Sequence, residues 1–388
     1  MDSNLGKLSR TDKKIVFCQE VDNIVNIYNG ESFDTITFLE KNEIFTRPYN
    51  YDYLLIPYKD HDFVDDYKTF IEEIEEIKGV SDINMYRTGT YSNTALCHFD
   101  KYNKVECDTI SEYEIKFFAN GGGVRVAEPY EGKAYKYDIN SYYPSIMNST
   151  INRFPTKQGT LTTIEQDEFD KLKYYKIGVY NVKIECDNPK KFTLLKSNMY
   201  SHHEINYAKK LNLKMNVLGQ HLLYDPKDCL SFQSVFGKFV TELYDLKTDH
   251  KPFKKIMNCL WGTLVTKRGG IKSIFSSLEK FNIPDTEILK IELVKDDVYK
   301  IQYEAKVKSY KFGFARINPF LLGFARANMH KTFEKIGYEH VKYSHTDSII
   351  TSRRLHNNDL KFSDDLGDWK FEGISQNCKV TNMNKYKF

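Results

Sequence analysis

The sequence predicts an α+β fold, in which short strands and longer helices share one chain. Two short strand patterns end at or near an aspartate, at Asp138 and at Asp347. Helical patterns mark residues 65–78 and 236–267, and an Asn-Pro pair is expected to begin a third helix over residues 318–337. A chain of 388 residues is long enough for two or three domains.

The composition is that of an ordinary soluble protein, with 41% hydrophobic and 28% charged residues. No apolar run approaches the length of a membrane span, and the N-terminal residues contain no signal-peptide core. An intracellular protein without a membrane partner is therefore expected. Seven scattered cysteines without a Cys-x-x-Cys pair argue against a zinc site or a disulfide framework. The net charge of +3 is too small to indicate nucleic-acid binding, but residues 235–275 and 301–335 are rich in basic groups, which suits a path for phosphates.

The helix expected over residues 65–78 is amphipathic. Its apolar residues, from Tyr67 to Ile77, share one face, and its glutamates form a solvated one. Gly79 is expected to end it. Residues 270–312 are expected to form strands. The segment 236–267 reads as two helices broken near Pro252.

The stretch around Asp138 is the most informative in the chain. A short strand, Ala134-Tyr-Lys-Tyr, leads into Asp138. The chain must then turn, because Pro144 disfavours helix at Tyr143 and suits a first helical turn itself. An acid at a strand end before a tight turn suits a carboxylate that holds a divalent cation, with backbone amides facing a polyphosphate.

A second acid, Asp347, has a similar setting. Two short strands are expected to flank a hairpin tip, His345-Thr346, that carries Asp347. Two acids on neighbouring strand ends could hold a pair of metal ions, which is the arrangement for in-line displacement at phosphorus. Taken singly, each aspartate is more often an ordinary turn or cap residue.

Three stretches occur in a fixed order: Asp138-x-x-Ser-Tyr-Tyr-Pro-Ser, Lys254-x-x-x-Asn258-x-x-x-Gly262 and Tyr343-x-His-Thr-Asp347-Ser. Together they resemble the three polymerase motifs of family B DNA polymerases. The resemblance is closest to the protein-primed branch, the enzymes of phages, adenoviruses, linear plasmids and Polintons. It covers about residues 110–388.

The resemblance implies a right-hand polymerase palm, built as an antiparallel sheet with helices, together with helical fingers and a short or missing thumb. Residues 1–110 would form a smaller α/β region, a degenerate or absent exonuclease, since no Asp-x-Glu metal pair occurs there. Residues 111–235 would begin the palm and hold an insertion that contacts a terminal protein. Residues 236–268 would form the fingers, and residues 269–388 the rest of the palm with the primer-side strands.

The implied activity is template-directed DNA synthesis, in which a primer 3′-hydroxyl attacks a dNTP and releases pyrophosphate. Asp138 and Asp347, with the backbone carbonyl of Ile139, would hold two Mg²⁺ ions or Mn²⁺. Lys254 would be a further catalytic residue, which neutralises the charge that develops on the triphosphate. The expected nucleotide-binding residues are Ser141 and Tyr142 through their backbone amides, Tyr143 beneath the sugar, Lys254, Asn258 and, at a less typical spacing, Lys247.

The implied partners are primer–template DNA, dNTPs and a terminal protein primer. The expected DNA-binding residues are Gly122 and Gly123 in a glycine-rich turn, Trp261 and Gly262 on the second helix, and Tyr386 near the end. Lys254, Met257, Asn258 and Trp261 are expected to share one helix face. The glycine turn could instead be a simple hinge. The family has a Lys-x-Tyr motif that holds the primer strand. Here Asn384 stands in place of the lysine, so the resemblance implies a primer contact for Tyr386 only.

His345 departs from the family pattern, because most relatives carry aspartate there. Its imidazole suits Mn²⁺ better than Mg²⁺. An alternative function is therefore a catalytically inactive relative that binds DNA or a replication partner. A palm-type RNA polymerase or reverse transcriptase is a further alternative. The bulky Tyr143 argues against ribonucleotides as substrates, but it does not distinguish a DNA template from an RNA template.

Overall fold

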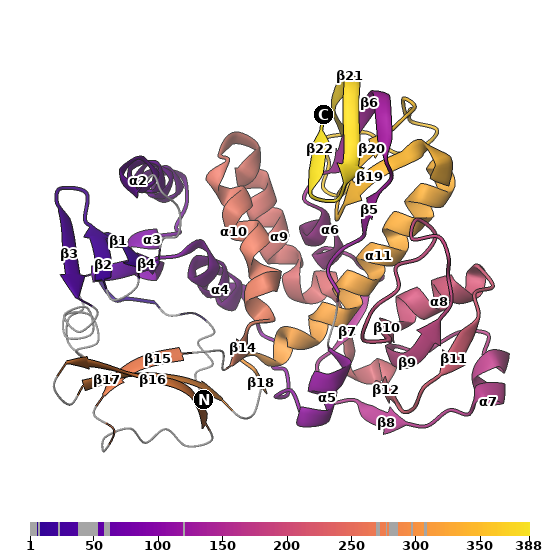
Figure 1. Ribbon diagram of the computed structural model, residues 1–388, viewed down its shortest axis with the longest axis horizontal. Helices are drawn as coiled ribbons and strands as arrows, with labels where there is room; N and C mark the ends of the chain where they lie inside the picture. The colour runs from indigo at the N-terminus through magenta and orange to yellow at the C-terminus, as the bar shows by residue number, and fades with distance from the viewer. Residues whose placement is uncertain are drawn as a thin grey trace. The chain divides into compact units, whose positions relative to one another are not determined.

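The computed structural model describes residues 6, 8–21, 24–37, 53–57, 63–118, 121–268, 272–276, 278, 286–295, 298–305 and 309–388. The chain divides into two compact units (Figure 1). The first unit comprises Met1–Lys104 and Thr241–Lys308, and the second comprises Val105–Val240 and Ser309–Phe388. Along the part of the chain that is described, every helix is too short or too polar to cross a membrane.

In the first unit, a four-stranded sheet has the order β3-β2-β1-β4. β1, β2 and β3 form an antiparallel meander, and β4 pairs parallel to β1. Helix α2 packs on this sheet through aromatic rings. The ring centroid of Phe17 lies 5.2 Å from that of Tyr67 and 5.4 Å from that of Phe70. The bounds are β1 Lys14–Val21, β2 Ile24–Tyr28, β3 Phe33–Thr37, β4 Tyr53–Pro57 and α2 Phe63–Val80.

The expected helix over residues 65–78 is confirmed, but Gly79 does not end it. Gly79 lies within the last turn of α2, and a Cβ there would meet no atom within 4 Å. The position is open and exposed, so glycine costs the helix only about 1 kcal/mol relative to alanine, which packing of the buried face offsets.

The described residues of the first unit form further helices and strands. Helix α10 packs against α4 and α2, and the expected break near Pro252 is confirmed by the end of α9 at Asp249. A separate three-stranded antiparallel sheet has the order β15-β17-β16, as expected for residues 270–312. The bounds are α3 Met85–Thr88, α4 Tyr91–Tyr102, α9 Phe232–Asp249 (shared with the second unit), α10 Pro252–Leu264, β14 Lys267–Arg268, β15 Lys272–Ser276, β16 Thr286–Lys295 and β17 Val298–Ala305.

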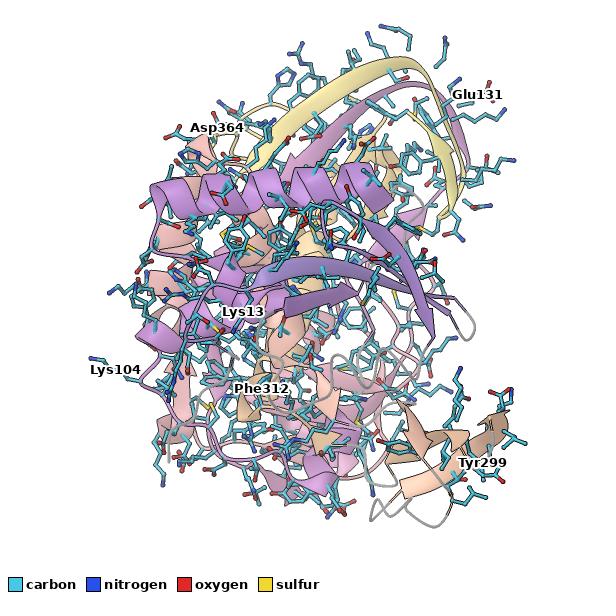
Figure 2. The ribbon with its side chains drawn as sticks, turned by 90° about the vertical axis from the view of Figure 1, so that its left-hand side faces the viewer. Lys13, Lys104, Glu131, Tyr299, Phe312 and Asp364 are labelled. Atoms are coloured by element: carbon cyan, nitrogen blue, oxygen red, sulfur yellow. The ribbon has the colours of Figure 1, made fainter. Side chains whose placement is uncertain are left out.

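The centre of the second unit is an antiparallel six-stranded sheet with the order β22-β21-β6-β20-β19-β5. Its long strands β6 and β21 curve together toward the labelled Glu131 (Figure 2). The expected helix over residues 318–337 is confirmed as α11, which is buried on nearly all sides. The bounds are β5 Arg125–Ala127, β6 Tyr130–Ile139, α6 Tyr142–Met147, α11 Ile317–Ile336, β19 Val341–His345, β20 Ser348–Thr351, β21 Trp369–Asn382 and β22 Lys385–Lys387.

A smaller subdomain of the second unit lies between the α6 and α9 segments of the chain. It holds the sheet β10-β9-β12-β8, with β11 also pairing β9, and a core made mainly of tyrosines, isoleucines and phenylalanines. The bounds are β7 Arg153–Pro155, β8 Thr160–Thr162, α7 Gln166–Lys171, β9 Gly178–Ile184, β10 Met199–Ser201, α8 His202–Lys210, β11 Met215–Val217, β12 His221–Leu223 and β13 Cys229–Ser231. The remaining elements are α5 Glu112–Phe117, β18 Ser309–Tyr310 and the 3-10 turns Pro226–Asp228, Gly313–Arg316 and Tyr338–His340.

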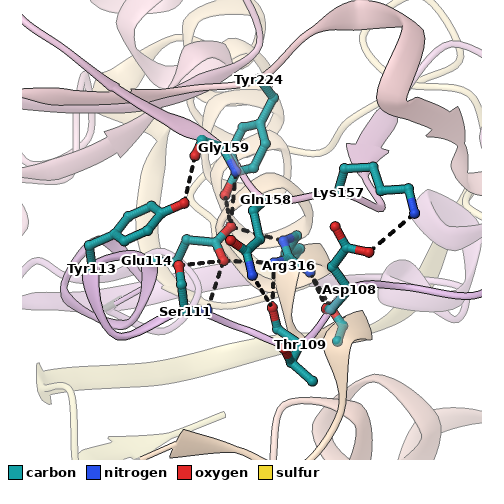
Figure 3. A network of polar contacts seen from close by, with 11 residues as sticks. Asp108, Thr109, Ser111, Tyr113, Glu114, Lys157, Gln158, Gly159, Tyr224 and Arg316 are labelled. Carbon is teal, nitrogen blue, oxygen red and sulfur yellow. Dashed lines mark hydrogen bonds and ion pairs between the residues drawn. The ribbon is translucent and has the colours of Figure 1, made fainter.

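A fully buried ion pair joins α5 to the chain just before α11 (Figure 3). Arg316 donates to both carboxylate oxygens of Glu114, at 2.9 and 2.6 Å. The remaining guanidinium hydrogens reach the carbonyls of Asp108 and Thr109, and Tyr224 donates to Glu114 at 3.1 Å. Because every buried charge is met by hydrogen bonds, the pair is compatible with the core and fixes α5.

Candidate active site at the six-stranded sheet

The sheet brings Asp138 and Asp347 to the same end of neighbouring central strands. Asp138 is the penultimate residue of β6, and its direct partner on β20 is Ser348, the residue after Asp347. The backbone N–H of Ile139 donates to the carbonyl of Asp347 at 3.0 Å. The expected juxtaposition of two acids on neighbouring strand ends is therefore present.

The hairpin tip differs by one residue from the expectation. His345 is the last residue of β19, so the tip is Thr346-Asp347 and not His345-Thr346. Thr346 has φ +62°, and its N–H donates to the carbonyl of Val124 at 2.8 Å. This hydrogen bond to a neighbouring loop stabilises a left-handed residue that the sequence does not signal, because threonine is uncommon there.

The glycine-rich turn packs against this hairpin tip. A Cβ at Gly123 would lie 3.0 Å from the Cα of Thr346, so close approach requires glycine there. Gly122 is exposed, and its carbonyl accepts a hydrogen bond from Arg326 at 2.9 Å. Arg326 is 1% exposed and also donates to Glu204 at 2.8 Å. Sequence reasoning missed Arg326, since a buried arginine looks like any other basic residue of a helix.

The turn after Asp138 is tighter than expected. Ser141 takes a left-handed conformation, with φ 50° and ψ 58°, and α6 already begins at Tyr142. Tyr143 is therefore helical despite preceding Pro144, which corrects the expectation. Pro144 is the third residue of the helix, where an N–H has no partner within the helix, so the ring sacrifices no hydrogen bond.

The two tyrosines of this turn differ in their surroundings. Tyr142 is 4% exposed, and its hydroxyl donates to the carbonyl of Ala325 on α11 at 2.8 Å. Tyr143 stacks on it, with ring centroids 5.9 Å apart. Burial, together with the Asp347 carboxylate, raises the pKa of Tyr143 to about 12, so its phenol stays protonated at neutral pH beside that acid.

Arg125, His345, Ser348, Asp138 and Lys370 form one row across the sheet. The register pairs His345 with Arg125, His345 with Ser348, Ser348 with Asp138, and Asp138 with Lys370. Directly paired residues point to the same face of a sheet, so Lys370 is the direct cationic neighbour of Asp138 on one side. On the other side Ser348 comes first, followed by His345 and then Arg125. Arg125 and Lys370 were not expected as site residues, because their pairing depends on contacts far apart in the sequence.

Tyr386 lies on β22 with its ring against that of Tyr343, at a centroid distance of 4.5 Å and an interplanar angle of 34°. Tyr343 is two residues before His345 on β19, so it points to the same face as the row of Asp138. Tyr386 remains 43% exposed, which leaves its ring accessible from that face.

The residues of the second motif belong to the first unit and form a strip along α10. Lys254, Asn258 and Gly262 are exposed, and Trp261 is half-buried. Met257, expected on the same face, is 1% exposed and belongs to the core. Met257 lies on the buried face of α10 together with Phe253 and Leu260. The expectation from helical spacing, which placed Met257 on the exposed face with Lys254, is therefore wrong. Lys247 lies on α9 with its ammonium 4.2 Å from the Tyr244 ring centroid.

The chemistry of the donors at Asp138 and Asp347 fits a hard divalent cation such as Mg²⁺, because both offer carboxylate oxygens at one sheet end. In the first unit, the described residues contain one further cluster with three ligand types, Asp82, His98 and Glu242, whose ligand atoms lie within 4.8 Å of one another. There, Lys101 pairs with Asp82, and Tyr102 donates to Glu242 at 3.0 Å. Protein groups thus already compensate these acids.

The chain matches a model of a known protein family. A family model described as DNA polymerase type B, organellar and viral, matches residues 9–335. The matched span includes Asp138 and the strip on α10, and stops before Asp347. No curated protein and no solved structure matches the chain.

Proposed function

The chain belongs to the organellar and viral type B DNA polymerases, and from this premise we propose that it extends a primer 3′-hydroxyl with dNTPs on a DNA template. The observation that carries the proposal is the placement of Asp138 and Asp347 at one end of adjacent central strands, joined by the hydrogen bond between Ile139 and Asp347. Membership of the family implies primer–template DNA and dNTPs as partners and dependence on a divalent metal.

Asp138 and Asp347 would hold two metal ions, Mg²⁺ or Mn²⁺, with the carbonyl of Ile139 as a further ligand. When bound, the ions would lower the pKa of the primer hydroxyl and stabilise the leaving pyrophosphate. The backbone amides at the start of α6, around Ser141 and Tyr142, would receive the triphosphate, because the N–H groups of a first helical turn lack partners within the helix. Tyr143, beside Asp347, would lie under the sugar and exclude a 2′-hydroxyl.

From the resemblance of the second motif, the strip on α10 is proposed to contact the nucleotide as well. Lys254 would neutralise charge that develops on the triphosphate, and Asn258 would contact the nucleotide, with Lys247 as a further phosphate contact. Trp261 and Gly262 would lie along the nascent base pair. Gly122 and Gly123 would contact the template, and Tyr386 the primer.

Protein priming is proposed from the resemblance of the motifs to that branch. The subdomain of β8 to β12 would then contact the terminal protein, since it occupies the chain between the first two motifs. Residues 1–110 contain no Asp-x-Glu pair, so we propose that this region does not degrade a mismatched primer 3′ end.

A catalytically inactive relative is the second candidate, and His345 is the observation that favours it. His345 is exposed and stands in the row of Asp138, where it brings no negative charge. Primer extension by purified protein separates the two candidates. A labelled DNA primer–template is incubated with dNTPs and either Mg²⁺ or Mn²⁺, and extension with at least one metal supports the polymerase. Binding of the same DNA without extension under either metal would support the inactive relative.

A further inference from the structure

Two lysines flank Asp138 on its own face of the sheet. Lys370 of β21 is the direct partner of Asp138 in the antiparallel register, so their Cα atoms are about 5 Å apart. Lys136 precedes Asp138 by two residues on β6, about 7 Å along the strand, and points to the same face. No bulge interrupts β6 between these positions in its pairing with β20.

Neither lysine is committed to another group of the protein. Lys370 is exposed and Lys136 is half-buried, and among the described residues neither ammonium forms a hydrogen bond or an ion pair. Other lysines of the same two strands differ. Lys379 on β21 pairs with Glu131 at 2.8 Å, and Lys133 on β6 lies 5.8 Å from the Tyr135 ring. The two available ammonium groups are therefore those beside the acid.

The direction of the chain indicates which phosphates they meet. β6 runs from Lys136 through Asp138 to the turn at Ser141, where we place the triphosphate. Lys136 thus lies on the opposite side of Asp138 from that turn. Its row across the sheet runs through Ile350 to Tyr343, whose ring contacts that of Tyr386. Phosphates that approach Asp138 from the side of Lys136 would therefore be backbone phosphates of the primer strand and not those of the dNTP.

We propose that Lys136 and Lys370 bind backbone phosphates of the primer strand next to its 3′ end, a role that rests on the polymerase function proposed above. A lysine ammonium is a compact point charge with three donors on a flexible stem, which suits a phosphodiester whose position shifts at each cycle. The ammonium groups also offset the negative charge that the primer brings toward Asp138 and Asp347. The ligand chemistry is a phosphate group, and its two possible sources are the primer and the dNTP.

The test measures DNA binding without catalysis. Fluorescence anisotropy follows a primer–template with a 3′-dideoxy end, in Mg²⁺ and without dNTP, between 50 and 200 mM salt, a range of about fourfold over which phosphate contacts weaken. Lys370→Ala and Lys136→Ala should each raise Kd roughly three- to tenfold at low salt and reduce the slope of log K against log salt by about 0.9, the value for one lost contact. The matched controls Lys379→Ala and Lys133→Ala should leave both quantities unchanged. Lys370→Arg should restore the slope, since it keeps the charge.

The outcomes separate the possible readings. Unchanged Kd and slope in both alanine variants would overturn the inference, and so would a raised KM for dNTP with unchanged DNA binding, which would assign the lysines to the triphosphate. If the wild type binds DNA as predicted but extends no primer with any metal, the proposed function fails while the phosphate sites stand. If an alanine variant does not fold, Lys370→Gln and Lys136→Gln, which keep most of the stem, carry the same comparison.

Discussion

Replacing Arg326 by methionine should destabilise the second unit strongly. Arg326 is 1% exposed and Glu204 is 2% exposed, so the substitution leaves a buried carboxylate without its cationic partner. It also removes the donor to the carbonyls of Gly121 and Gly122. Breaking a buried pair in this way costs about 3–5 kcal/mol. Ser201 still donates to Glu204 from its N–H and hydroxyl, so the lower end of this range is expected.

The assay is urea unfolding followed by tryptophan fluorescence. The chain has two tryptophans, Trp261 in the first unit and Trp369 in the second, so a Trp261→Phe background makes Trp369 report on the second unit alone. With an m-value of about 2 kcal/mol/M, a loss of about 3 kcal/mol lowers the midpoint by about 1.5 M. Arg354→Met is the matched control. Arg354 is exposed and contacts the Phe371 ring at 5.8 Å, so its loss should cost less than about 1 kcal/mol.

A loss for Arg326→Met as small as that of the control would refute the reasoning about the buried pair. The same variant should also lower DNA synthesis below the level that its folded fraction explains. The glycine-rich turn that Arg326 holds packs on the hairpin tip of Asp347, so loosening the turn disturbs the acid.

Three further predictions concern the site and the core. Tyr143→Val should raise incorporation of ribonucleotides relative to deoxynucleotides roughly tenfold or more, since it removes the ring beside Asp347; the ratio of the two kcat/KM values measures it, and an unchanged ratio places Tyr143 elsewhere. His345→Asp should keep or raise Mg²⁺-dependent extension and reduce the preference for Mn²⁺, as a metal titration of both proteins would show. Burial lowers the pKa of His202 to about 4, so the unfolded chain binds the proton first and stability should fall as pH drops from about 6.5 to 4. Burial also lowers the pKa values of His203, His221 and His330, so His202→Phe should make the fall less steep without abolishing it, in unfolding curves measured across that range. An equally steep fall in the variant would show that His202 does not contribute.

The sequence predicts the parts of the site that depend on local pattern. The strand before Asp138, the hairpin of Asp347 and the helices on either side of Pro252 all follow from short-range periodicity and turn chemistry, and the structure contains them. The hairpin tip predicted from the sequence lies one residue before the observed tip. The reason is that Thr346 takes a left-handed conformation, which a hydrogen bond to Val124 stabilises. That contact joins segments far apart in the chain.

Long-range pairing explains the other differences. Lys370 and Arg125 neighbour Asp138 and His345 only because β21 and β5 pair in one particular register. Met257 is buried because α10 packs against two other helices, which helical spacing alone does not show. Register and packing partners are set by tertiary structure, so a single sequence does not determine them.

Asp138 and Asp347 together are proposed to hold the metals for nucleotide addition. The measurement is single-turnover extension of a DNA primer by the wild type, Asp138→Asn and Asp347→Asn, with DNA affinity determined in parallel and the exposed Asp365→Asn as control. Each acid variant should lose roughly a thousandfold or more in rate while its Kd for DNA changes little, because each removes a charged metal ligand and leaves the fold intact. Extension by either variant at close to the wild-type rate would contradict the account.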